Sequence, residues 1–279
     1  MKQKIEKDGI IIKPPSSVFD AINLKEIISR IDLLFALAIR DIKIRYRRTI
    51  IGFGWAVIQP FAQMVIFSLI FGKFTKIPSE NVPYPIFVYS ALVPWQLFAR
   101  ALNDASMSVV NNIHIISKIY FPRIILPMSV IISALVDFFS AFSILILLMI
   151  FYGVIPTAKA LLFPVFVFVE ILCALGVALW LSALNVKFRD VKYTLQFLTQ
   201  IWLFATPVIY PAKIIPEKFK FIFALNPMTG VVEGFRWILL NTTPPDFTMM
   251  AISTLVIFII FIFGVVFFYK MEKEFADIM

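Results

Sequence analysis

Two carboxylates, Asp137 and Glu170, lie deep inside long apolar stretches of the sequence. A charged carboxylate in hydrocarbon costs a few kcal/mol on insertion scales, so such groups usually face a protein interior or water. One chemistry that fits them is a proton or ion relay, which would indicate an ion-coupled secondary transporter. The other is a structural carboxyl, either neutral or hydrogen-bonded to a neighbouring helix. Neither acid has an evident basic partner within the membrane, and we therefore favour the structural interpretation.

Other chemistries are excluded by what the sequence lacks. It contains no G-x-x-x-x-G-K-[ST] loop for phosphate, no H-E-x-x-H and no G-x-S-x-G. Cys173 is the sole cysteine and His114 the sole histidine, so neither an internal disulfide nor a metal site built from cysteine and histidine is expected. We expect no catalytic residues, no metal and no cofactor bound by this chain.

The composition indicates elements that cross a bilayer. Of 279 residues, 61% are hydrophobic and only 15% are charged, whereas soluble domains carry more charge. Each helical span needs about 20 apolar residues. We predict an all-α integral membrane protein with six transmembrane helices, at about 50–72, 84–110, 124–153, 160–186, 193–210 and 247–269. The second of these carries Arg100 and Asp104, which stand four positions apart and can pair on one helix face.

The distribution of positive charge sets the predicted orientation. Lys and Arg concentrate before the first span, after the second and fourth, and after the last. Both termini are therefore expected in the cytoplasm. The net charge of +9 fits such loops better than a nucleic-acid partner, for which no separate basic domain exists. We divide the chain into a cytoplasmic tail with an interfacial helix, 1–48, and a single transmembrane domain, 49–279.

A dense group of cations stands directly before the first span. On a helix over 32–48, Phe35, Ile39, Ile42 and Tyr46 fall within an arc of about 60°. The cations outside this arc are Arg40, Lys43, Arg45, Arg47 and Arg48. We predict an amphipathic helix at the membrane surface, packed beneath the bundle, whose cations meet anionic lipid headgroups. A simple topology anchor is the alternative.

The segment 211–246 is too apolar for a solvated loop, yet its prolines, glycines and charges prevent it from spanning. We predict two short helices, 219–225 and 229–240, with Thr229 capping the second and Glu233 paired with Arg236. Amphipathic half-helices that dip back into the membrane would form an external gate, and a pair of interfacial helices covering the bundle is the alternative. The gate candidates are Asn226, Pro227, Glu233 and Arg236.

Four strings, in this order, carry a resemblance that covers essentially the full chain. They are the basic stretch IRYRR before GFGWAVIQP, then NNIHIISKIYFPR, then NVKFRD, and last TPVIYP followed by LNP. Together with the six-span layout, they resemble the membrane subunit of ATP-binding-cassette exporters of lipid-linked polysaccharides, the branch of O-antigen, capsule and teichoic-acid exporters. The resemblance implies a bacterial or archaeal cytoplasmic membrane, a lipid-linked glycan as substrate, and a homodimer that binds two copies of a separate ATPase. ATP and Mg would be bound by that partner.

The resemblance also implies roles for individual residues. Residues 111–123 would be the coupling helix that docks on the ATPase, with an ordinary inter-span turn as the alternative, and Arg189 and Asp190 would be second contacts or inner gate residues. The docking residues would be Ile115, Ile116, Lys118, Ile119 and Tyr120.

Aromatic faces suit a sliding sugar chain. The candidates along the substrate pathway are Phe53, Trp55, Trp202 and Phe204. Two other functions stay open at this point, an exporter of drugs or small amphiphiles on the same scaffold and the ion-coupled transporter.

Overall fold

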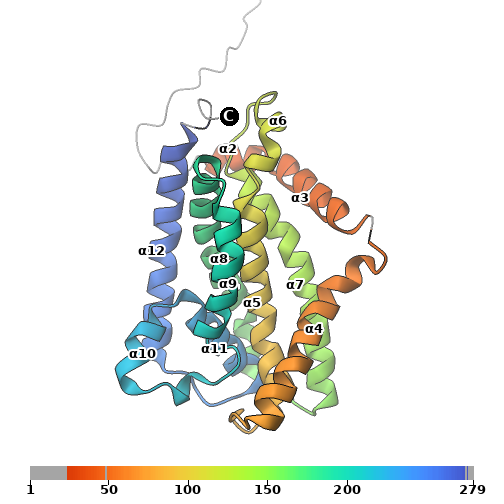
Figure 1. Cartoon of the computed structure of the whole chain (residues 1–279), viewed down its shortest axis with the longest axis vertical. Coiled ribbons are helices and arrows are strands. Elements are labelled where there is room, and N and C mark those ends of the chain that lie inside the picture. The colour runs from red at the N-terminus through yellow and green to blue at the C-terminus, as the bar shows by residue number, and fades with distance from the viewer. Residues whose placement is uncertain (1–23, 48, 274, 276–279) are drawn as a thin grey trace, which may run out of the picture.

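The structure is a computed structural model that describes residues 24–47, 49–273 and 275, and the regular elements in this part of the chain are all helical (Figure 1). The longer helices are α3 (Ile31–Tyr46), α4 (Trp55–Phe67), α5 (Tyr84–Ser106), α7 (Ile125–Phe151), α8 (Phe163–Lys187), α9 (Val191–Ala205), α11 (Pro227–Leu240) and α12 (Phe247–Glu272). The shorter ones are α2 (Leu24–Ser29), η1 (Gly52–Gly54), η2 (Ser68–Phe74), η3 (Val110–Asn112), α6 (Ile113–Ile116), η4 (Ala158–Leu162), η5 (Ala212–Ile214) and α10 (Glu217–Ala224).

The bundle has two distinct ends. The short helices α2 and α6 and the start of the described chain lie at one, which we call the α6 end, and α10 and α11 lie near the other, which we call the α10 end (Figure 1). Four segments are long and apolar enough to cross a membrane: Gly52–Phe74, Ile125–Phe151, Ala158–Lys187 and Phe247–Glu272. They coincide with the predicted first, third, fourth and sixth spans to within a few residues.

The predicted second and fifth spans are also helices, but they differ from the other four. Helix α5 carries Gln96, Arg100 and Asp104 within its 23 residues, which lowers its apolar character. Helix α9 has only 15 residues, because Thr206 precedes Pro207 and takes an extended conformation that ends the helix. The total of six spans therefore stays a prediction.

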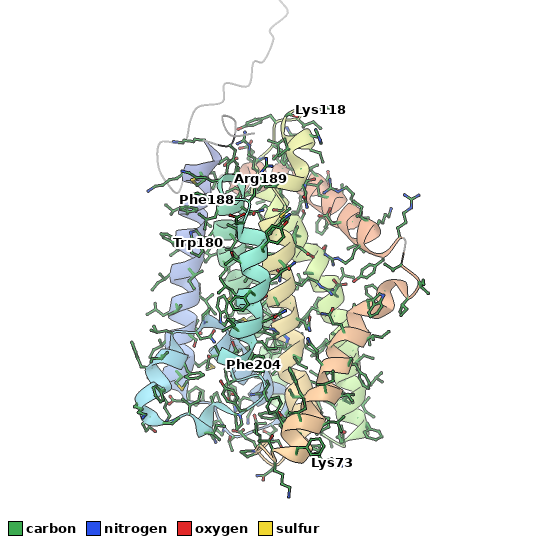
Figure 2. All side chains as sticks on the ribbon, viewed as in Figure 1. Lys73, Lys118, Trp180, Phe188, Arg189 and Phe204 are labelled. Carbon is green, nitrogen blue, oxygen red and sulfur yellow. The ribbon has the colours of Figure 1, made fainter. Side chains whose placement is uncertain are left out.

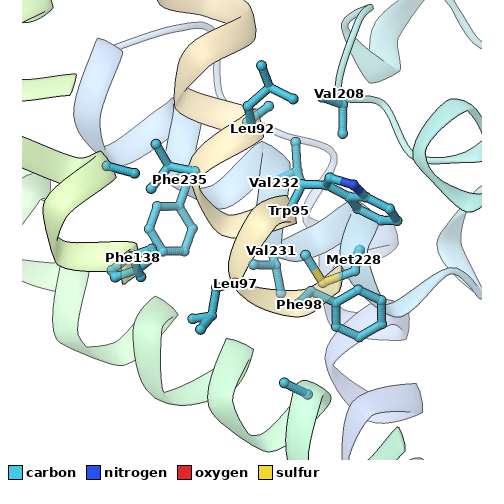
Figure 3. Packing of buried hydrophobic residues seen from close by; sticks show 14 of the residues in the cluster. Leu92, Trp95, Leu97, Phe98, Phe138, Val208, Met228, Val231, Val232 and Phe235 are labelled. Atoms are coloured by element: carbon cyan, nitrogen blue, oxygen red, sulfur yellow. The ribbon is translucent and has the colours of Figure 1, made fainter. Parts of the chain in front are cut away.

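Helix α5 forms the centre of the bundle. Most of its side chains are buried, because it packs against α7, α8 and α11. Figure 3 shows Leu92, Trp95 and Phe98 of α5 among the buried side chains of the neighbouring elements, with Phe138 of α7 on one side and Met228 of α11 on the other. A helix enclosed by protein can carry polar groups that lipid would not accept, which explains its composition.

Helices α8 and α12 approach each other closely at two glycines. A Cβ atom at Gly264 would lie 2.2 Å from the carbonyl oxygen of Gly176, and one at Gly176 would lie 2.7 Å from the Cα of Phe261. Small residues allow helix backbones to come into contact in this way in membranes. The two helices therefore pack backbone against backbone at this point.

Helix α3 exists as predicted and lies against α7, but its predicted apolar arc is only partly turned to the bundle. Leu34, Leu37 and Ala38, outside the arc, are buried, whereas Phe35 and Ile39 of the arc are exposed. At the end of the helix, Tyr46 of the arc does turn inward. The predicted interfacial residue Arg48 lies outside the described residues.

The short helices of the α10 end lie within two residues of their predicted bounds, as α10 and α11. The cap of α11 is different from the predicted one. The side chain of Asn226, at the N-cap, accepts a hydrogen bond from the backbone N–H of Met228 at 3.1 Å, while the Thr229 side-chain oxygen is buried without a hydrogen-bond partner among the described residues. Asparagine takes the cap because Pro227 fixes the first helical position immediately after it.

Candidate functional site

The predicted coupling segment, 111–123, is helical only at its start. η3 and α6 together end at Ile116, and turns and irregular backbone follow. Ile115 and Ile116 are partly buried against neighbouring apolar side chains. Ile119 and Tyr120 instead project outward, 56% and 61% exposed. Of the five predicted docking residues, two therefore pack against the protein, Ile115 and Ile116. The other three are exposed: Lys118, Ile119 and Tyr120.

This segment is fixed to the rest of the α6 end by buried contacts. Phe121 and Ile124 belong to a hydrophobic cluster, here called the α6-end core, which also contains residues of α3, α8 and α12. Arg123, the last residue of the segment, donates to the backbone oxygen of Glu272 of α12 at 2.6 Å. An exposed apolar pair on a firmly held segment is suited to docking a partner protein.

Arg189 and Asp190 lie in the turn between α8 and α9, and both are exposed. Figure 2 shows Arg189 and Phe188 toward the same end of the molecule as Lys118, with Lys73 at the opposite end. The aromatic ring of Phe188 is also exposed. The structure thus places Arg189 and Asp190 at the same end of the molecule as the predicted coupling segment.

A charge cluster joins α3, α5 and α7, and it differs from the sequence prediction at every member. It consists of Arg45, Tyr46, Arg100, Asp104 and Asp137. The Arg45 guanidinium donates to Asp137 at 2.5 Å and to Asp104 at 2.8 Å. Arg100 and the Tyr46 hydroxyl also donate to Asp137.

Three corrections follow. Asp137 is not an isolated acid, because two arginines and a tyrosine converge on it. Arg100 pairs with Asp137 on α7 rather than with Asp104 on its own helix. Arg45 was predicted to meet lipid headgroups, but its side chain points into the bundle instead. Sequence reasoning missed Tyr46 as a polar ligand, although a buried acid in an apolar stretch signals that a donor must come from elsewhere.

The electrostatics of the cluster keep Arg45 and Tyr46 in their protonated forms. Burial raises the pKa of the Tyr46 phenol and the hydrogen bond to Asp137 raises it further, so the phenol remains a proton donor. Burial alone would lower the pKa of Arg45, but Asp104 and Asp137 more than compensate, and the net shift is upward. Removing one partner from such a buried pair leaves an uncompensated charge, which is strongly destabilising.

Three of the four predicted pathway aromatics are exposed. Phe53 and Trp55 lie at the start of the first span and Phe204 lies on α9. The Phe53 ring packs edge-on against Tyr46 of the charge cluster, with 5.3 Å between ring centroids. Trp202 differs, because it is partly buried against Phe98. The predicted set therefore contains three exposed rings, one of which also contacts Tyr46, and one ring that is partly buried.

The gate candidates form a tightly bonded structure at the α10 end. Asn226 accepts a hydrogen bond from Trp202 at 2.9 Å and donates to the Thr206 hydroxyl at 2.9 Å, which ties α9 to α11. Pro227, the first residue of α11, is buried. Arg236, only 1% exposed, pairs with Glu233 at 3.0 Å and stands 3.7 Å from the centroid of the Phe87 ring. Its guanidinium also donates to the backbone oxygens of Phe87, Pro207, Val208 and Tyr210.

Glu170 has no such partners. It is fully buried in α8, and neither of its carboxyl oxygens makes a hydrogen bond within the part of the chain that the structure describes. An anion without a partner in this environment is strongly disfavoured, so we expect the neutral acid.

Replacing Glu170 by glutamine should therefore have little effect. The amide matches the neutral acid in shape and charge, and we expect the free energy of unfolding to change by less than about 1 kcal/mol. Replacing it by lysine should cost about 2.5–3.5 kcal/mol on insertion scales. Thermal unfolding of the purified variants measures both effects. A relay role would be indicated instead if Glu170→Gln abolished transport in a fully folded protein.

A family model and several known proteins match most of this chain in sequence. The family model for the ABC-2 type transporter matches residues 32–240. The O-antigen export system permease protein RfbA of Myxococcus xanthus is 30% identical over 249 residues, which are 88% of this chain and 94% of that protein. The RfbA protein of Klebsiella pneumoniae is 28% identical, over 89% of this chain and 95% of that one. The polysialic acid transport protein KpsM of Escherichia coli is 24% identical, over 72% and 78%.

Proposed function

The chain belongs to the ABC-2 type transporter family, and from this we propose that it is the membrane subunit of an ATP-driven exporter that moves a lipid-linked polysaccharide across the cytoplasmic membrane. The observation that carries the substrate class is the similarity to O-antigen and polysialic acid transport proteins over most of both chains.

The proposed assembly is a homodimer with two copies of a separate ATPase, which binds the ATP and Mg. In this arrangement each protomer has six spans, including α5 and α9, and both termini are cytoplasmic, so the α6 end faces the cytoplasm. The outward face formed by Ile119 and Tyr120, together with Arg189 and Asp190, would receive the ATPase. The exposure and firm support of this face favour that role.

The substrate pathway would lie where two protomers meet. Exposed aromatic rings on α4 and α9 support this, because flat apolar rings let sugar C–H faces slide without a fixed hydrogen-bond register. α10 and α11 would form the outer boundary of the pathway. The ion-coupled alternative is less consistent with the side chains, since Asp137 is held by two arginines and Glu170 has no bonded connection to any other polar group in the described structure.

Reconstitution tests the proposal directly. The purified chain would be placed in proteoliposomes with its ATPase and with lipid-linked polysaccharide isolated from the source strain, and protection of the glycan inside the vesicles would be followed. We expect translocation only with ATP and the ATPase, and none with an ATPase variant unable to hydrolyse ATP. Translocation driven by an ion gradient without the ATPase would contradict the proposal. Transport of small amphiphiles but not of the glycan would contradict the substrate class.

A further inference from the structure

Helix α3 is attached to the protein in two chemically different ways. In its first half, Leu34 and Leu37 belong to the α6-end core together with Phe121 of the coupling segment. At its end, Arg45 and Tyr46 enter the charge cluster and bind α5 and α7. Eight residues separate Leu37 from Arg45, which is about 12 Å along a helix. One rigid helix thus connects the predicted docking segment to two central helices of the bundle.

The second attachment is highly directional. Asp137 is almost completely buried, and Arg45 reaches it while bonding Asp104 through its other terminal nitrogen. Apolar side chains can slide past one another with small changes in energy, whereas a charge that leaves a buried partner loses several kcal/mol. The end of α3 is therefore held at one place on α5 and α7, and a displacement of α3 must move those helices or break the cluster.

The cluster also lies where the chain turns into the first span. The Tyr46 ring contacts Phe53, and Ala56 and Pro60 of α4 line a small cleft together with Arg100 and Asp137. In the connection between α3 and α4, Gly52 has a φ of 57°, a left-handed conformation that favours glycine and sharply redirects the chain. The position of α4, with its exposed aromatic face, consequently depends on where the cluster fixes the end of α3.

We propose that Arg45, together with Tyr46, is the positioning residue that transmits displacement of the coupling segment to α4, α5 and α7. This inference rests on the proposed function, because it concerns how ATP hydrolysis by a partner is coupled to movement of the spans. Arg45 contacts neither the ATPase nor the glycan in this scheme. It acts by keeping α3 in register with the bundle while the α6 end moves.

The test compares Arg45→Met with Arg30→Met in the reconstituted complex. Arg30 is an exposed cation at the N-cap of the same helix and belongs to none of the predicted sites. For Arg45→Met we expect ATP hydrolysis to continue near the rate of the unmodified protein, because Arg45 contacts neither the ATPase nor the glycan in this scheme. The glycan exported per ATP hydrolysed should fall by about tenfold or more, because the transmission step is lost. Arg30→Met should leave both quantities unchanged.

Milder variants keep the inference falsifiable if Arg45→Met does not fold. Tyr46→Phe removes one donor to Asp137, and Asp104→Asn weakens the half-exposed arm of the cluster; each should lower the export-to-ATP ratio by a smaller factor. Arg45→Lys should restore part of that ratio. Equal ratios in folded Arg45→Met and Arg30→Met, or a parallel fall of hydrolysis and export, would overturn the inference. If the unmodified complex shows no ATP-dependent export, the proposed function itself fails.

Discussion

Replacing Arg236 by leucine is expected to remove most of the folded protein. The Arg236 side chain is fully enclosed and donates to four backbone oxygens as well as to Glu233. Leucine would remove the guanidinium donor from all four oxygens, of which that of Phe87 would still accept from the Ser90 hydroxyl, and it would leave the Glu233 carboxylate without its counter-charge. Breaking a buried ion pair costs about 3–5 kcal/mol, and a domain is typically stable by about 5–15 kcal/mol in total. The amount of monodisperse protein after detergent extraction and heating measures the effect.

A conservative change at Arg236 distinguishes the contribution of its positive charge from that of its hydrogen-bond geometry. Arg236→Lys retains a positive charge but cannot reach several carbonyls at once, and we expect an intermediate loss. Lys218→Met, at an exposed lysine of α10 near the same end, serves as the control and should behave like the unmodified protein. If Arg236→Leu were recovered with normal yield and thermal stability, the view that this arginine holds α11 against the 207–210 segment would be wrong.

Replacing Ile119 and Tyr120 together by glutamate is expected to abolish export while leaving the isolated subunit intact. Both side chains are exposed, so the charges add no desolvation in the free protein. In a docked complex the same charges would be buried against the ATPase without partners, and truncation or mismatch at such central contacts commonly costs 2 kcal/mol or more, about thirtyfold or more in affinity. Co-purification of the ATPase and ATP-dependent export should fall together.

The matched control places two glutamates at apolar positions that are more exposed still and lie far from the predicted docking face. Ile155 and Leu161 are 81% and 83% exposed, on the connection between α7 and α8. The control pair Ile155→Glu with Leu161→Glu should retain the ATPase. Retention of both the ATPase and export in the Ile119→Glu, Tyr120→Glu protein would show that the coupling segment docks elsewhere, or that it is an ordinary turn.

The helices were predictable because each long apolar run ends where charge or proline begins. Helix α12, for example, starts at residue 247 in both the prediction and the structure, since Asp246 caps it directly after two prolines. The choice between faces of α3 was not predictable in the same way. Both of its sides are apolar, and only the neighbouring α7 decides which of them is buried.

The charge cluster shows a second limit of sequence reasoning. Arg100 and Asp104 have the spacing of a local helical pair, but each finds its partner on another helix. A local pair on a helix surface contributes only about 0.2–0.5 kcal/mol, which is too little to compete with the need of buried Asp137 for counter-charges. Likewise, Glu233 and Arg236 pair as predicted, yet nothing in their spacing indicated four backbone oxygens around the guanidinium.

The contact of Gly264 with the backbone of Gly176 restricts how this protomer can change shape. Backbone rests on backbone at that crossing, so we expect α8 and α12 to move together as one body. Rearrangement during a working cycle would then fall to the helices outside this pair, including α3, α4, α5 and α7. The redirected chain at Gly52 lies within that moving part, between α3 and α4.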